Sequence, residues 1–234
     1  RPMYWDAWDI DIYYREKRYS VQQACEWEVL ENGPSRVVLA FTWPFLESTI
    51  KQRMIVYANN RRIDFETEVD WHERQILLKA AFPVAVRATK ATYEIQFGNV
   101  ERPTHWNTSW DYAKFETVAQ KWIDLSQRDY GVSLLNDCKY GHDVKDNVMR
   151  ITLLKSAIFP DPNADQGHHE FTYSLLPHTG DWYEGGTTRA AYELNYPLRA
   201  VYADAAAGSL PSSDSLIKVS GESAVLETVK KSEA

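Results

Sequence analysis

The stretch from Glu101 to Asp143 interleaves aromatic rings with amide, carboxylate and cationic groups. Its aromatic members are Trp106, Trp110, Trp122, Tyr112, Tyr130 and Tyr140, and its polar members are Arg102, His105, Asn107, Asp111, Asp137, Lys139 and His142. A pyranose sugar has apolar C–H faces and a polar rim of hydroxyl groups, so this mixture suits a carbohydrate-binding surface. The same mixture can build a wet interface between two parts of one protein. Composition leaves both interpretations open.

Hydrolysis of a glycosidic bond needs two carboxylates that face each other across the sugar at a defined separation. The sequence contains 33 Asp and Glu residues, but no local motif pairs two of them. Asp111 and Asp137, in the two polar parts of the stretch, are the best acid candidates. We expect each of them to stabilise its loop or to contact a sugar hydroxyl rather than to donate a proton.

A group of potential metal ligands lies around His168-His169-Glu170, with Asp161 and Asp165 shortly before it. Successive side chains of a strand point to opposite faces, so the two histidines would not easily share one ion. His72-Glu73 lacks the His-Glu-x-x-His spacing of a zinc-binding helix. We therefore expect no metal site in this chain.

The bulk composition limits the class of protein. With 234 residues, 44% hydrophobic and 25% charged, the chain suits one large all-β domain or two small ones. The net charge of −7 and the lack of a basic stripe argue against nucleic acid as a partner. Cys25 and Cys138 cannot build a disulfide framework, which favours a reducing, cytoplasmic compartment. No apolar run reaches membrane-spanning length and no secretory signal opens the chain, so no membrane partner is expected.

The remaining sequence predicts strands that position this stretch. From Ile63 to Trp71, apolar residues alternate with Asp64, Glu66 and two further acids, which is typical of a half-buried antiparallel strand with a solvated acidic face. A dozen or more short runs at 8–14-residue spacing, with almost no amphipathic helix, predict a large antiparallel sandwich. The predicted strands include 36–43, 49–57, 63–71, 75–84, 91–97, 115–118, 121–125, 131–135, 148–154, 171–175, 216–219 and 225–229. Two polar loops are expected at 102–111 and 136–146.

Several segments resemble a known family. ERPTHWNTSWDYAKFE, followed by W-x-D-L-S and YGVSLLNDCKYGHD, is similar to the C-terminal β region of glycoside hydrolase family 38, the α-mannosidases. Three more segments agree in the same order, namely WDAWDIDIYY, ITLLKSAIFPDPNADQGHHEFTYSLLPHTGDW and the AYELNYPL run. The resemblance covers essentially the whole chain and looks closest to the cytosolic, vacuolar and bacterial branch.

The resemblance implies an all-β fold, a large antiparallel two-sheet supersandwich similar to that of galactose mutarotase. We assign residues 1–203 to this domain and 204–234 to a linker and truncated C-terminal strands. Both chain ends look cut, which predicts a fragment of a longer polypeptide. Family members resemble retaining glycosidases with a zinc ion and an Asp nucleophile in an N-terminal α/β barrel. Nothing here matches those motifs, so no catalytic residue is carried over, and zinc is expected only in the absent domain.

The resemblance also implies the partners. These are the N-terminal catalytic domain of the same polypeptide and a mannose-containing oligosaccharide, because one loop of the β region completes the sugar pocket in such enzymes. Our candidate is Asn136–Asp143: Lys139 and His142 would donate to sugar hydroxyls, Asp137 would accept, and Tyr140 would stack. These residues could instead only hold the interdomain interface. The tryptophans at positions 5, 8, 106 and 110 are expected in an interface or in the core.

Three other functions stay open. The chain could be an independent carbohydrate-binding module, or a mutarotase-like epimerase with a His and a carboxylate that converge in the sandwich groove. A purely structural role in an oligomer is the third. If the family resemblance holds, the isolated chain is expected to be inactive.

Overall fold

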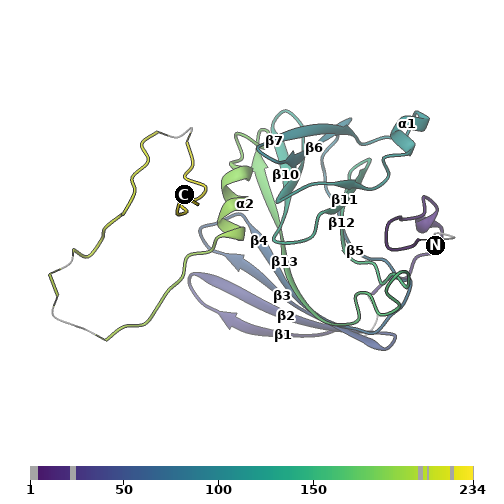
Figure 1. The fold of residues 1–234 in the computed structure, drawn as a ribbon, viewed down its shortest axis with the longest axis horizontal. Coiled ribbons are helices and arrows are strands. Elements are labelled where there is room, and N and C mark those ends of the chain that lie inside the picture. Colours follow the sequence, from purple (N-terminus) through teal and green to yellow (C-terminus); the bar gives the residue numbers. More distant parts are fainter. Residues whose placement is uncertain (1–4, 22–24, 205–207, 210, 222–223, 234) are drawn as a thin grey trace. The chain divides into compact units, whose positions relative to one another are not determined.

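Two antiparallel β-sheets dominate the computed structural model of this chain (Figure 1). The structure describes residues 5–21, 25–204, 208–209, 211–221 and 224–233, and within them it has thirteen strands. Three short helices accompany the sheets: the 3-10 helix η1 (Tyr14–Glu16), α1 (Ser109–Tyr112) and α2 (Thr187–Asn195). The predicted all-β, two-sheet antiparallel fold is confirmed.

The larger sheet has nine strands in the order β1-β2-β3-β4-β13-β10-β9-β6-β7. The bounds in that order are β1 (Glu26–Asn32), β2 (Arg36–Phe45), β3 (Ser48–Tyr57), β4 (Ile63–Trp71), β13 (Gly167–Thr179), β10 (Tyr130–Asn136), β9 (Trp122–Ser126), β6 (Lys90–Ile95) and β7 (Gly98–Pro103). The smaller sheet has the order β5 (Leu78–Pro83), β12 (Val148–Leu154), β11 (Gly141–Lys145) and β8 (Thr117–Val118). β13 pairs with both β4 and β10, and so joins two halves of the larger sheet.

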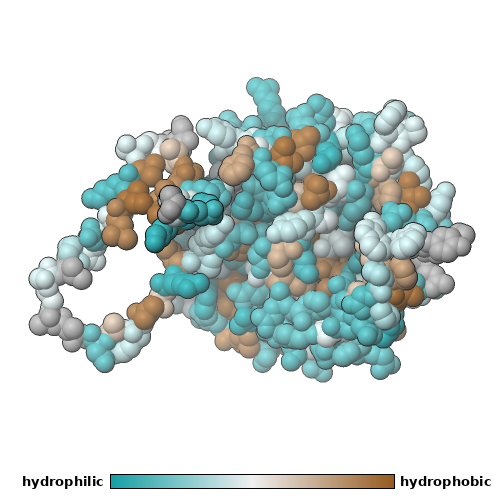
Figure 2. All heavy atoms as spheres, viewed as in Figure 1, coloured by the Kyte–Doolittle hydropathy of each residue, from teal (hydrophilic) through white to brown (hydrophobic). Residues whose placement is uncertain are grey.

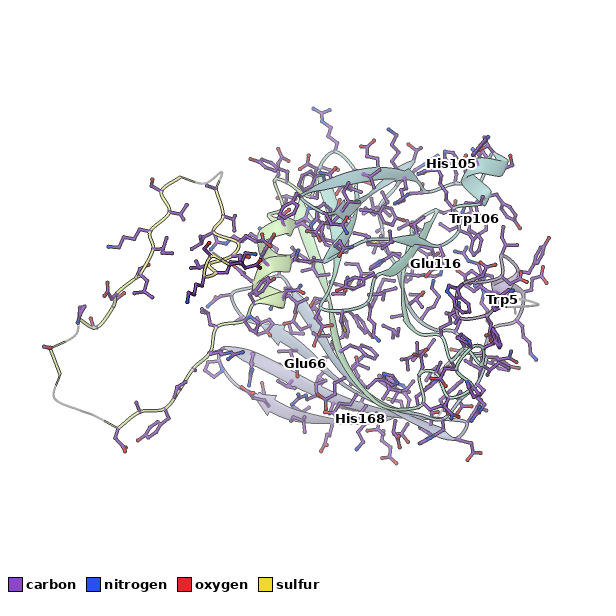
Figure 3. The ribbon with its side chains drawn as sticks, in the orientation of Figure 1. Trp5, Glu66, His105, Trp106, Glu116 and His168 are labelled. Carbon is purple, nitrogen blue, oxygen red and sulfur yellow. The ribbon has the colours of Figure 1, made fainter. Side chains whose placement is uncertain are left out.

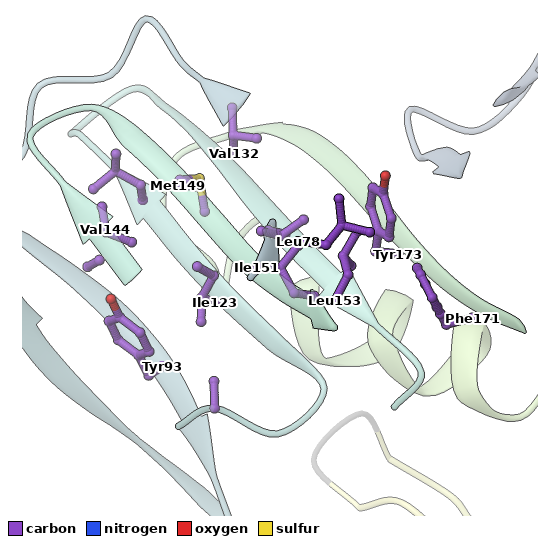
Figure 4. Close-up of a cluster of buried hydrophobic side chains, with 14 of the residues drawn as sticks. Leu78, Tyr93, Ile123, Val132, Val144, Met149, Ile151, Leu153, Phe171 and Tyr173 are labelled. Carbon is purple, nitrogen blue, oxygen red and sulfur yellow. The ribbon is translucent and has the colours of Figure 1, made fainter. Parts of the chain in front are cut away.

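The main core fills the space between the two sheets. In β12, Met149, Ile151 and Leu153 alternate with polar residues and are almost fully buried. They pack with Ile123 of β9 and Tyr93 of β6, as the close-up in Figure 4 shows. Period-two alternation puts one face of each strand into this core and leaves the other face for polar side chains.

A second, smaller core lies on the opposite face of the larger sheet, beneath α2. Trp122, Leu135, Leu176 and Ala191 form it, and Trp182 stacks on Trp122 with 5.2 Å between ring centroids. α2 is therefore held by its apolar side and covers β9, β10 and the end of β13.

One acidic strand differs from its prediction. β4 runs from Ile63 to Trp71 as predicted, and its last two acids are exposed, but Asp64 is only 4% exposed. The Ser174 hydroxyl donates to Asp64 Oδ1 at 2.6 Å, the Tyr57 hydroxyl donates to Oδ2 at 2.7 Å, and Arg62 Nε lies 2.7 Å from Oδ1. Strand alternation cannot reveal such partners, because two of them belong to other strands.

Residues 1–198 form one compact unit, and residues 199–234 form a second one. The described residues of the second unit adopt no helix or strand, so the strands predicted at 216–219 and 225–229 are wrong for this structure. A run of β-forming residues becomes a strand only when another backbone pairs with it. The assignment of 204–234 as linker and truncated strands stays a prediction. Among the described residues, no helix has the length and apolar character needed to cross a membrane.

Candidate functional site

The loop between β10 and β11, Asp137–Tyr140, is fixed to its surroundings by hydrogen bonds. The Asp137 amide donates to the Thr172 carbonyl at 3.1 Å, and the Thr172 amide donates to Asp137 Oδ2 at 2.9 Å. Asn136, at the end of β10, accepts from the Lys139 amide through Oδ1 at 2.8 Å. The loop therefore has a defined shape before any ligand binds, which lowers the entropic cost of recognition.

The side chains of this loop differ in exposure. Tyr140 is 48% exposed, so its ring is available for stacking. Lys139 lies with Nζ 4.6 Å from the centroid of the Phe171 ring, and Asp137 Oδ1 is buried. Cys138 is also exposed, but desolvation and the neighbouring Asp137 raise the pKa of its thiol to about 12. The loop thus presents one aromatic face and one cation, with an inert thiol.

The prediction that His142 donates to a sugar hydroxyl needs correction. The strand β11 begins at Gly141, so His142 is a strand residue, and it lies opposite Ile151 with no exposed surface. Its Nδ1 lies 3.1 Å from the Tyr140 carbonyl, while Nε2 is buried and has no hydrogen-bond partner among the described residues. Burial lowers the pKa of His142 to about 4, which keeps the imidazole neutral. The side chain holds the end of the loop from inside the core.

A charged cluster that the sequence did not reveal lies on the outer face of the smaller sheet. Asp143, 3% exposed, accepts from Lys79 Nζ at 2.8 Å, from Arg150 Nη1 at 2.9 Å, from Arg15 and from the Tyr14 hydroxyl at 3.1 Å. Burial alone would raise the pKa of Asp143, but the three cations outweigh it and hold this pKa below 3.8. Asp143 is therefore a fixed anion that ties the N-terminal segment to β11.

A second carboxylate completes this cluster. Glu116 pairs with Lys79 and accepts from the Thr152 hydroxyl. Gly141 leaves room for it, since a Cβ there would lie 2.8 Å from Glu116 Oε1. Arg15 covers Trp106, with its guanidinium 4.4 Å from the ring centroid, and Figure 3 shows Trp106 above Glu116. Both carboxylates are occupied by cations, so this arrangement serves to join segments rather than to transfer protons.

The alternation of strand residues holds a signal for this cluster. Lys79, Asp143 and Arg150 occupy the outward positions of three neighbouring strands, between residues that face the core. Once the strand register is known, their proximity follows. Arg15 comes from a segment without periodicity, and no sequence pattern would have placed it there.

The first polar loop has a local structural role. Thr108 caps α1 in a capping box: the Asp111 amide donates to Thr108 Oγ1 at 3.2 Å, and the Thr108 amide donates to Asp111 Oδ2 at 3.3 Å. This arrangement satisfies free amide groups at the start of the helix. Asp111 thus stabilises its own loop, which is one of the two roles expected for it, the other being contact with a sugar hydroxyl.

The histidines of β13 do not converge on a common point. His168 Nε2 lies 2.9 Å from Glu170 Oε1 at the surface, whereas His169 Nε2 lies 2.8 Å from the Asp165 carbonyl. Within the described ranges, no three His, Cys, Asp or Glu side chains gather into a possible ion site. These side chains do not fit the zinc ion that the family resemblance implies.

Ser133, His178 and Asp124 form a buried polar network between the larger sheet and α2. His178 Nε2 lies 2.7 Å from Asp124 Oδ2 and 3.2 Å from Ser133 Oγ, and all three residues are at most 3% exposed. A hydrolytic triad uses one imidazole nitrogen for the serine and the other for the carboxylate. Here one nitrogen serves both, so the network joins β9, β10, β13 and α2 instead of activating a nucleophile.

Comparison with known proteins shows which family this chain resembles. A family model described as "Glycosyl hydrolases family 38 C-terminal domain" matches residues 1–163. Alpha-mannosidase 2C1 of Homo sapiens is 44% identical over 100% of this chain, Alpha-mannosidase G of Dictyostelium discoideum 40% over 99%, and the Alpha-mannosidase of Saccharomyces cerevisiae 35% over 100%. The chain spans 22% of the length of each of these relatives.

Solved structures support the fold. An alpha-mannosidase from Enterococcus faecalis V583 superposes with a TM-score of 0.67 at 17% sequence identity. The alignment covers 74% of this chain and 24% of that chain. The two-sheet architecture is therefore shared despite low identity.

Proposed function

Because this chain belongs to glycosyl hydrolase family 38 and is a C-terminal domain of that family, we propose that it is the non-catalytic β domain of a zinc-dependent retaining α-mannosidase. The supporting observation is that it aligns along its whole length with only 22% of several alpha-mannosidases. The catalytic domain then belongs to the remaining length of the polypeptide. Zinc is assigned to that domain, since no side-chain set described here fits it.

An exposed aromatic cluster supports packing against the catalytic domain. Trp5 and Trp8 are 59% and 66% exposed, and the Trp5 ring lies 4.9 Å from Phe159 and 5.7 Å from Trp8, measured between centroids. The Asp6 carboxylate accepts from the amides of Ile158 and Phe159 at 3.1 and 2.9 Å, which fixes the cluster. Figure 2 shows hydrophilic residues over much of the visible face, with smaller hydrophobic patches among them. Ordered, exposed aromatic residues of this kind fit a protein–protein interface.

The loop Asp137–Tyr140 is our proposed contribution to the sugar pocket. Tyr140 would stack on an apolar sugar face and Lys139 would donate to hydroxyl groups, while Asp137, whose Oδ2 accepts from the Thr172 amide and whose Oδ1 is buried, would hold the loop in shape. His142 supports the loop from beneath without touching the sugar. The fixed backbone of the loop and the exposure of Tyr140 support this assignment.

Hydrolysis of an aryl α-mannoside by two forms of the protein tests the placement of catalysis. The intact polypeptide should hydrolyse the aryl α-mannoside. A chelator should abolish this activity, and added zinc should restore the activity. The 234-residue chain should be inactive, and hydrolysis by this chain would overturn the assignment.

A pair of aromatic substitutions tests the role of the loop. In the intact enzyme, Tyr140→Ala should raise KM about fivefold, as expected from loss of roughly 1 kcal/mol of stacking. Phe97→Ala is the matched control, because Phe97 is 96% exposed at the β6–β7 turn and belongs to no proposed site. Equal KM values in the wild type and Tyr140→Ala would restrict the loop to a structural role.

An independent carbohydrate-binding module is the second candidate function, favoured by the ordered loop with an exposed Tyr140. Titration of the 234-residue chain with mannobiose should then give saturable heat that Tyr140→Ala reduces. The epimerase alternative has less support. Asp124, the carboxylate that meets His178, is only 1% exposed and cannot reach a substrate in this structure.

A further inference from the structure

A cavity of about 320 Å³ lies at the end of the larger sheet, next to α2. It opens between the β3–β4 turn, the last part of β13 and the first turns of α2. Figure 1 shows α2 beside β10 and β13. Its lining includes Asn60, Arg61, His178, Arg189 and Glu193. This volume is within the range of small-molecule sites, about 300–1,000 Å³. The cavity is distinct from the loop near Thr172, because Thr172 and His178 lie six positions apart along β13, or about 20 Å.

One wall of the cavity is rigid. The His178 ring lies between Gly131 and Gly185, where a Cβ at either position would collide with the imidazole. Asp124 and Ser133 hold Nε2 at 2.7 and 3.2 Å, and Ser133 Oγ lies 2.6 Å from Thr187 Oγ1 in α2. The network thus fixes the first turn of α2 against the sheet. A cavity with such a wall is formed before a ligand arrives, which favours binding.

The lining carries a positive excess, although the whole chain has a net charge of −7. Two arginines face one glutamate, and Arg189 Nε pairs with Glu193 Oε1 at 2.9 Å. Among the residues that the structure describes, no hydrogen bond or ion pair involves the exposed guanidinium of Arg61. The cavity also adjoins the N-terminal end of α2, where backbone dipoles favour negative charge.

The lining contains no Phe, Tyr or Trp, and its one ring, the imidazole of His178, is only 3% exposed, so a neutral sugar would find little stacking surface. Guanidinium groups instead make strong, directional hydrogen bonds to carboxylate and phosphate oxygens. From the rigid wall, the free arginine and the lack of Phe, Tyr and Trp in the lining, we propose that this cavity binds a small anion bearing a carboxylate or phosphate group. Arg61 and Arg189 are its charge partners, and Glu193 competes for Arg189. This site is independent of the α-mannosidase assignment.

Calorimetric titration of the full polypeptide with inorganic phosphate and, separately, with citrate tests the proposal at constant ionic strength. At least one of the two anions should bind saturably. The anion that binds more tightly shows whether the cavity prefers a phosphate or a carboxylate group. Arg61→Ser and Arg189→Ser should each weaken that binding about tenfold, as expected for loss of a charge-assisted hydrogen bond. Glu193→Gln should strengthen it, because Arg189 is then released.

The control variant is Arg87→Ser, since Arg87 is also exposed but lies outside the cavity lining. Its anion affinity should equal that of the wild type. Both substituted arginines are at the surface, and circular dichroism of each variant will check that it is folded. The proposal is overturned if neither anion binds saturably, or if the Arg61→Ser, Arg189→Ser double variant binds as tightly as Arg87→Ser.

Discussion

Replacement of Asp143 by Asn removes one negative charge from a buried cluster without a change of shape. The carboxylate holds Lys79, Arg150, Arg15 and the Tyr14 hydroxyl, and its own side chain is 2% exposed. In the variant, Lys79 keeps Glu116 as a partner, whereas Arg15 and Arg150 lose the carboxylate that they share. Loss of one partner from a buried ion pair costs about 3–5 kcal/mol. The three cationic side chains keep 10–16% of their surface exposed, so we expect the lower end, about 3 kcal/mol.

The measurement is urea unfolding of the 234-residue chain, followed by the fluorescence of buried tryptophans. The matched control is Asp146→Asn. That side chain is 71% exposed and pairs with Lys145 at the surface, and the residue has a backbone φ of 56°, which Asn adopts readily. The control should change the free energy of unfolding by less than about 0.5 kcal/mol.

A second test is the pH dependence of the difference in free energy of unfolding between the wild type and Asp143→Asn. Because the folded pKa of Asp143 is lowered below 3.8, its stabilisation is present above the unfolded value of about 3.9. It is lost as the pH falls through the folded pKa. The free-energy gap between wild type and Asp143→Asn should therefore be constant from neutral pH down to about 4.5 and close below that. A gap smaller than about 1 kcal/mol at neutral pH, or one that persists in strong acid, would refute the reasoning.

Three further predictions rest on single side chains. Leu135→Ala should cost about 2–5 kcal/mol in urea unfolding, because Leu135 is fully buried beneath α2, whereas Leu46→Ala, at a 70% exposed turn residue, should cost little. His142 should remain neutral in NMR titrations down to about pH 4, and its burial should remove up to about 3 kcal/mol of stability as the pH falls from 6.5 to 4. The stability of His142→Phe should not fall in this way with pH. An equal fall in the variant and the wild type would contradict the assignment of the effect to His142. Asp6→Ala leaves two backbone amides without their acceptor, so it should lower stability by about 1–3 kcal/mol and increase proteolysis near Phe159.

The sequence predicted strands well where one face of the strand enters the core. β4 and β12 have the predicted bounds, because apolar alternation is a direct consequence of half-burial. Prediction from the sequence failed where a residue or strand depends on partners that are distant in the sequence. Asp64 is buried because Tyr57 and Ser174 donate to it, and residues 216–219 have no partner strand. The Arg15–Asp143 pair joins residues 128 positions apart and follows from topology alone.

The candidate loop shows why site residues are harder to predict than strands. Sequence composition assigned Tyr140 and His142 to one polar loop, since both side chains can bind sugars. In the structure, the β11 strand begins between them at Gly141, and from there the side chains alternate between two faces. His142 therefore turns into the core beside Ile151, while Asp143 turns outward to Arg150 and Lys79. A shift of one residue in the start of β11 would have exchanged these roles, placing a carboxylate in the core and a neutral imidazole among three cations. Only the pairing of β11 with β12 decides between the two arrangements, and that pairing is a property of the fold rather than of the loop.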